Sequence, residues 1–145
     1  PQFDAAQAAP RSLPGPRPPA KIDWLVGEAL TNLYVGMCRY RRGEKLSAQR
    51  FIQGYAVDRM VELAEQLYAP AGGPKDIFAG ERRIEQRFPE LAQALPGFVP
   101  GYEHSPQAAL AILAFIEAQF MVNDALKQRI VQLCAPDAAP GSSPA

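Results

Sequence analysis

The sequence predicts an all-α fold: an up-down bundle of four main helices plus one short irregular helix. Apolar residues recur at three- and four-residue spacing in several stretches, which is the period of a helix that buries one face. No stretch alternates apolar and polar residues over the length of a strand. The chain has 145 residues, of which 48% are hydrophobic and 21% charged, and this suits one globular domain. We therefore expect a single helical domain over residues 20–134.

The two ends of the chain differ in composition from this domain. Residues 1–19 predict a proline-rich linker, because proline fixes φ and removes a backbone donor, so PGPRPP forms neither helix nor central strand. Residues 135–145 are low in complexity and predict a disordered tail. The chain begins with Pro1, so we expect a further segment before it and read residues 1–19 as an interdomain linker.

The first two helices are predicted to form an antiparallel hairpin. The first should run from about residue 19 to 42, where Gly43 is a natural residue to end it. The second should begin at Ser47, whose hydroxyl can cap the free amides, and should end before Pro70. The short connection between them favours antiparallel packing.

Three further helical stretches complete the predicted bundle. Residues 81–88 and 89–95 should form a broken, irregular helical region, followed by a loop from residue 96. A helix capped by Ser105 should be the central buried element, because it is apolar nearly all round. Its expected core stripe is Leu110, Leu113, Phe115, Phe120 and Met121. A last helix should be capped by Asn123 and should bury Ile130.

Composition narrows the classes of function. Lys+Arg and Asp+Glu both number 15, so no global field attracts nucleic acid or an anionic membrane, and we expect neither as a partner. Cys38 and Cys134 are too few for a disulfide scaffold and favour a reduced, cytoplasmic setting. The single histidine, His104, excludes a zinc cluster of histidine and cysteine, and we assign no metal ligand or catalytic residue.

One face of the second helix holds the first candidate site. Arg50, Gly54 and Asp58 follow one another at four-residue spacing, so they share a face without a large apolar side chain. Counting from the turn places Gly36 of the first helix at the height of Gly54, so either the partner backbone or a ligand should come close there. An ordinary exposed salt bridge of Arg50 is the alternative.

A second candidate lies in the irregular region. Arg83 and Arg87 are one helical turn apart, and two guanidinium groups could hold a phosphate or a carboxylate. The alternative is a solvated turn in which these arginines pair with Glu81 and Glu85.

Three blocks of the sequence resemble the C-terminal helical domain of bacterial nucleotidyltransferase-superfamily proteins, the group that includes the kanamycin nucleotidyltransferase type. The blocks are WLVGEALTNLYVGMCRYRRGEKLSAQRFIQGYAVDRMVELAEQL, DIFAGERRIEQRFPELAQALPGF and GYEHSPQAALAILAFIEAQF, within residues 20–122. In that superfamily an N-terminal α/β domain carries Gly-Ser and D-x-D motifs that hold Mg²⁺ and the nucleotide, and the helical domain contacts the acceptor or the nucleotide. This sequence has no D-x-D, so the resemblance implies that the catalytic domain is absent here.

The resemblance implies a helical substrate- or nucleotide-binding domain that is not catalytic alone, whose parent protein is a Mg²⁺-dependent nucleotidyltransferase. Its implied partners are an upstream nucleotidyltransferase domain and a small-molecule or nucleotide ligand, with Mg²⁺ and a nucleotide as cofactors of the parent only. The predicted substrate-binding residues are Arg50, Gln53, Asp58, Arg59, Arg83 and Arg87.

A second hypothesis is a stand-alone helical module that dimerises or binds a nucleotidyltransferase. It predicts an exposed apolar patch of Trp24, Leu30 and Tyr34 on the first helix.

Overall fold

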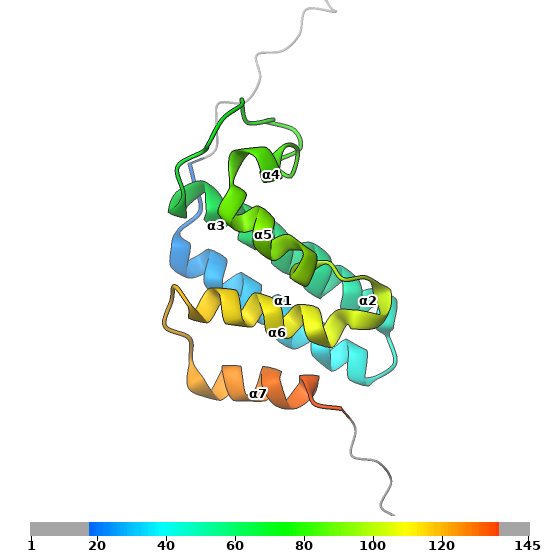
Figure 1. The fold of residues 1–145 in the computed structure, drawn as a ribbon. Helices are drawn as coiled ribbons and strands as arrows, with labels where there is room; N and C mark the ends of the chain where they lie inside the picture. Colours follow the sequence, from blue (N-terminus) through cyan, green and yellow to red (C-terminus); the bar gives the residue numbers. More distant parts are fainter. Residues whose placement is uncertain (1–17, 137–145) are drawn as a thin grey trace, which may run out of the picture.

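The computed structural model describes residues 18–136, and the fold is the predicted all-α, up-down bundle (Figure 1). No strand is present in this described range. The predicted linker and tail lie almost entirely outside it, in residues 1–17 and 137–145. In chain order the elements are α1 (Ile22–Arg41), α2 (Lys45–Gln49), the π-helix η2 (Arg50–Ala56), α3 (Val57–Leu67), α4 (Ile84–Arg87), α5 (Pro89–Phe98), the 3-10 turn η3 (Tyr102–His104), α6 (Ser105–Glu117) and α7 (Asp124–Cys134).

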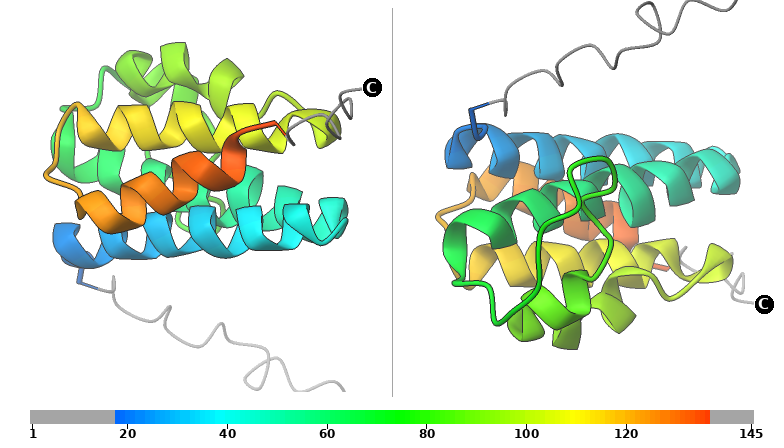
Figure 2. Two further views of the ribbon diagram at one scale, coloured as in Figure 1. Left: turned by 90° about the horizontal axis from the view of Figure 1, so that it is seen from below. Right: turned by 90° about the horizontal axis from the view of Figure 1, so that it is seen from above.

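Successive long elements run in opposite directions across the bundle (Figure 1). The first helix, α1, packs against the continuous rod of α2, η2 and α3, as the predicted hairpin requires, and also against α6 and α7. The second inner helix, α6, packs against α5 and α7 as well as η2 (Figure 2). The core therefore lies between α1 and α6, with the other helices around this pair.

Apolar side chains on the inner faces of α1 and α6 make up much of the core. In α1, Leu25, Ala29, Leu33 and Met37 are fully buried at the predicted helical spacing. The expectation that α6 is buried all round is wrong in part, because the helix ends at Glu117 and one side faces solvent. In the expected core stripe, Leu113 is buried, Phe115 and Phe120 are half-buried, Leu110 is exposed, and Met121 is 100% exposed.

Two of the predicted helix ends are confirmed. Gly43 follows α1 with φ +82°, a left-handed conformation that glycine adopts without a steric cost, and its N–H donates to the carbonyl of Tyr40. Asn123 caps α7, since its side-chain oxygen accepts a hydrogen bond from the Leu126 N–H at 3.0 Å.

Two predicted serine caps are wrong. The second helix begins at Lys45, before Ser47, and the Ser47 hydroxyl accepts a hydrogen bond from Arg39 at 2.9 Å. Ser105 is the first residue of α6 and is fully buried. Its hydroxyl accepts a hydrogen bond from the side-chain amide of Gln53 at 3.2 Å. Both hydroxyls thus bond to another helix and not to free amides of their own.

The loop predicted from residue 96 begins later. Helix α5 continues to Phe98 with Pro96 in its last turn. Proline in the last turn removes only a hydrogen bond near the helix end, and Phe98 is 1% exposed, so core burial supports the extra turn.

The predicted meeting of Gly36 and Gly54 is wrong. A Cβ on Gly36 would lie 2.5 Å from Cγ1 of Ile52 and 3.1 Å from Cβ of Phe51, so this glycine does allow the second rod to approach. A Cβ on Gly54 would have no neighbour within 4 Å. The cause is the start of the second helix, which begins at Lys45, two residues before Ser47. Counting seven residues from this earlier start leads to Ile52, the residue that lies against Gly36, and not to Gly54.

Candidate functional site

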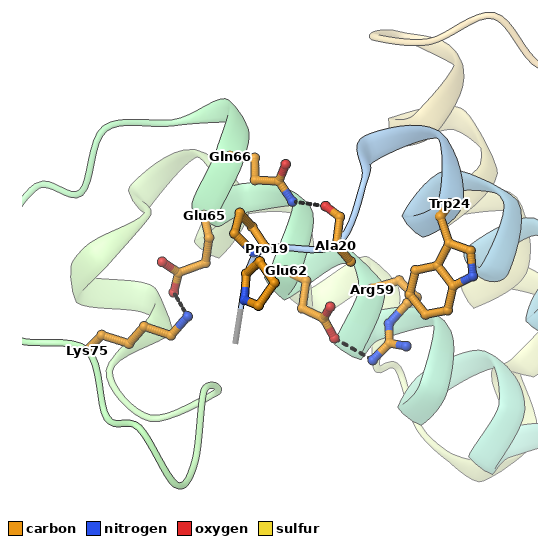
Figure 3. A pocket seen from close by; sticks show the side chains of 9 residues that line it. Pro19, Ala20, Trp24, Arg59, Glu62, Glu65, Gln66 and Lys75 are labelled. Atoms are coloured by element: carbon orange, nitrogen blue, oxygen red, sulfur yellow. Dashed lines mark hydrogen bonds and ion pairs between the residues drawn. The ribbon is translucent and has the colours of Figure 1, made fainter. Parts of the chain in front are cut away.

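A groove of about 710 Å³ lies between the start of α1, the polar face of α3 and the loop that follows α3 (Figure 3). The groove is lined by Pro18, Pro19, Ala20, Trp24, Arg59, Glu62, Glu65, Gln66 and Lys75. One wall comes from the residues that lead into α1. Gln66 fixes that wall, because its side-chain amide donates to the Ala20 carbonyl at 2.9 Å.

An aromatic ring and a guanidinium group lie together on one side of the groove. Trp24 is 50% exposed in the first turn of α1, and the guanidinium carbon of Arg59 lies 5.7 Å from its ring centroid. Arg59 also donates to the carboxylate of Glu62, one turn further along α3. A cation beside a tryptophan face is attracted by the ring quadrupole, so the ring holds Arg59 at the groove wall.

A carboxylate held from two sides forms the other end of the groove. Arg87 donates to both oxygens of Glu65, at 2.5 and 3.1 Å, and its side chain is only 5% exposed. Lys75 approaches Glu65 from the solvent side with its Nζ 3.6 Å from the carboxylate. The hydrogen bonds from Arg87, more than the charge of Lys75, lower the pKa of Glu65, so this side chain is an anion at neutral pH.

Of the six predicted binding residues, only Arg59 lines the groove. Arg87 lies behind it, buried, and reaches the groove only through Glu65. Arg87 also lies over the ring of Phe88, with its guanidinium carbon 4.9 Å from the ring centroid. Arg83 is exposed and has φ 61°, so it does not form a pair of outward guanidinium groups with the buried Arg87.

Gln53 lies away from the groove and joins η2 to the loop before α6. Its side-chain amide donates to the carbonyl of Gly101 at 2.7 Å and accepts from the N–H of Gly101 at 2.9 Å. Its third contact is the buried hydroxyl of Ser105. These hydrogen bonds satisfy the amide within the protein, so its position indicates that Gln53 holds η2 against the loop before α6.

Asp58 and Arg50 are both exposed. Partial desolvation raises the pKa of Asp58, and the negative charge of Glu81 adds to the rise while Arg59 opposes it. Within residues 18–136, the Arg50 side chain makes no hydrogen bond or ion pair. Of the predicted binding residues, the groove thus contains only Arg59. Ligand binding by the other five stays a prediction.

Sequence reasoning missed Trp24, Lys75 and the two glutamates as lining residues. One signal was present: positions 59, 62 and 66 share a helical face, and all three carry polar side chains. The sequence instead predicts Trp24 in an exposed apolar patch with Leu30 and Tyr34. That patch is not formed as predicted, since Leu30 is 5% exposed and belongs to the core.

Across residues 18–136, no three histidine, cysteine, aspartate or glutamate side chains are grouped so that they could hold a metal ion. No helix in the same range combines the length and apolar character that a membrane crossing requires. No protein-family model, no curated protein and no solved structure matches this chain.

Proposed function

We propose that this chain is the helical substrate- or nucleotide-binding domain of a nucleotidyltransferase-like protein, and that the groove beside Trp24 is its ligand site. The observation that supports this is the pairing of an exposed tryptophan face with Arg59 inside a groove of about 710 Å³. Sites for small ligands combine apolar or aromatic walls with a few placed polar groups, and this groove does so.

The nucleotidyltransferase part of the proposal rests on the sequence blocks that resemble its helical domain. One of those blocks contains Trp24, Arg59 and both glutamates of the groove, and this overlap supports the proposal. In this proposal an upstream domain supplies the D-x-D carboxylates, Mg²⁺ and the chemical step, and the helical chain binds and positions a substrate. The proposed location is the cytoplasm, in keeping with two free cysteine thiols.

Tryptophan fluorescence tests the ligand site directly, because Trp24 is the only tryptophan of the chain. Nucleotides and small polar acceptors are titrated into the protein while the emission of Trp24 is followed. We expect a saturable change for at least one compound. Arg59→Ala should weaken that binding, whereas Arg129→Ala, which changes an exposed arginine of α7 outside the groove, should leave it unchanged.

Two outcomes would count against the site. One is a panel in which no compound alters the emission of Trp24. The other is equal weakening by Arg59→Ala and Arg129→Ala, which would show that the effect does not come from the groove.

The interaction-module hypothesis keeps one supporting observation. Ile77 and Phe78 are consecutive loop residues with 69% and 82% of their surface exposed. Asp76 fixes this turn, because its carboxylate accepts hydrogen bonds from the N–H groups of Phe78 and Ala79. Sedimentation of the protein against Phe78→Ser tests a homodimer: the hypothesis expects a concentration-dependent dimer that the substitution abolishes.

A further inference from the structure

The groove carries a local surplus of positive charge although the chain as a whole is neutral. Two carboxylates face it, Glu62 and Glu65. Three cations contact them: Arg59 on Glu62, and both Arg87 and Lys75 on Glu65. Because Arg87 is buried and bonds both oxygens of Glu65, it compensates that carboxylate from behind.

Lys75 is the cation left in surplus. Its side chain is 52% exposed, and its contact with Glu65, at 3.6 Å, is longer than an ordinary hydrogen bond. An ammonium group has three donors, so an exposed Lys75 can turn toward an anion in the groove without leaving a buried carboxylate uncompensated.

Among the charged and aromatic side chains of the groove, most of the groups that remain free to form hydrogen bonds with a ligand are donors. Glu65 already accepts from Arg87 and Glu62 from Arg59. Guanidinium, ammonium and indole N–H groups can only donate, and Arg59, Lys75 and Trp24 bring all three to the groove. A ligand that fits must therefore supply acceptors, together with a flat face for the indole ring.

We propose that the groove binds a planar aromatic ligand that carries an anionic group, with its ring at the Trp24 and Arg59 end of the groove and its anion toward Lys75. This inference rests on the proposed function and selects one of its two ligand classes. A polycationic acceptor is disfavoured, because it would add positive charge to a groove in which three cations already contact two carboxylates.

Four probes distinguish the contribution of the aromatic ring from that of the charge. They are adenosine 5′-monophosphate, adenosine, inorganic phosphate and spermidine. Each is titrated into the whole chain, with Trp24 fluorescence for the unchanged protein and calorimetry for the variants. We expect the monophosphate to bind about tenfold more tightly than adenosine, the factor given by one charge-assisted hydrogen bond. Phosphate alone should bind weakly, and spermidine should not bind.

Variants assign the two contacts. Lys75→Ala should bring the affinity for the monophosphate down to that for adenosine, and Lys75→Arg should restore most of it. Trp24→Leu should weaken adenosine and the monophosphate by the same factor, about tenfold, because both share the ring. Arg129→Ala, which changes an exposed arginine of α7 outside the groove, is the control and should change neither affinity.

The outcomes are distinguishable. Spermidine binding more tightly than the monophosphate, or equal affinities for adenosine and the monophosphate in the unchanged protein, would overturn the anionic class and leave the groove as a ligand site. Failure of all four probes and of the wider panel would overturn the proposed function itself.

Discussion

Replacing Gly36 with alanine tests the closest approach between two helical rods in this fold. The new Cβ would lie 2.5 Å from Cγ1 and 3.0 Å from Cδ1 of Ile52, and 3.1 Å from Cβ of Phe51. Ile52 is fully buried, so any shift of its side chain has to be made against closely packed neighbours. The methyl group can be accommodated only if α1 and η2 separate or if Ile52 leaves its rotamer.

The size of the effect follows from two opposing contributions. Overpacking a well-packed core costs about 1–3 kcal/mol, and a contact at 2.5 Å belongs at the upper end of that range. Alanine in a helix interior is about 1 kcal/mol more favourable than glycine. We therefore expect Gly36→Ala to lower the free energy of unfolding by about 2 kcal/mol, or the melting temperature by roughly 8 °C in a domain of this size.

Urea unfolding followed by far-ultraviolet circular dichroism measures this change. Gly27→Ala is the matched control, because Gly27 lies in the same helix and a Cβ there would meet nothing within 4 Å. It should raise the free energy of unfolding by up to about 1 kcal/mol. A double-mutant cycle with Ile52→Ala, which removes the contacted Cγ1, should turn the effect of Gly36→Ala from unfavourable to favourable. Equal stabilisation by Gly36→Ala and Gly27→Ala would refute the steric reasoning.

Three further outcomes are expected. Asn123→Ala should lower the stability by about 1 kcal/mol in thermal unfolding, because it removes the cap of α7, while Asn123→Ser should not. Arg87 holds the pKa of Glu65 below its ordinary value of 4.5. The ion pair between Arg87 and Glu65 therefore stabilises the folded protein fully above pH 4.5, and this stabilisation is lost as the pH falls through the lowered pKa. Glu65→Gln should thus be less stable than the unchanged protein at neutral pH, and urea unfolding should show the difference shrinking in acid. Burial raises the pKa of the Cys134 thiol from 9.0 to about 11, so alkylation followed by mass spectrometry should find it about a hundredfold less reactive than an exposed thiol until the protein is unfolded.

The sequence predicts the helices well because their signals are local. The spacing of Leu25, Ala29 and Leu33 determines which face of α1 is buried, and Gly43 and Asn123 mark helix ends by their own backbone and side-chain chemistry. The predicted caps at Ser47 and Ser105 are wrong because each hydroxyl bonds to a residue of another helix, and such a contact is not visible in a local pattern.

The candidate site is predicted less well because it depends on contacts between distant parts of the chain. Arg59 appears in the correct block, but its neighbours Trp24 and Lys75 come from another helix and from a loop. Arg87 looks like an exposed anion-binding group in the sequence, yet it is buried by its pairing with Glu65, which is 22 residues away along the chain. Charge alone does not tell a surface arginine from one that compensates a carboxylate.

The wide turns of η2 bear on how the chain tolerates a change of length. A π-helical turn accommodates additional residues while the helices on either side keep the faces they present to the core. Deleting one residue between positions 50 and 56 would allow the rod from Lys45 to Leu67 to continue as a regular α-helix, with Ala48 and Met60 still directed inward. A single deletion elsewhere in this rod, with η2 kept as it is, would turn one half by about 100° relative to the other and expose its apolar side chains to water.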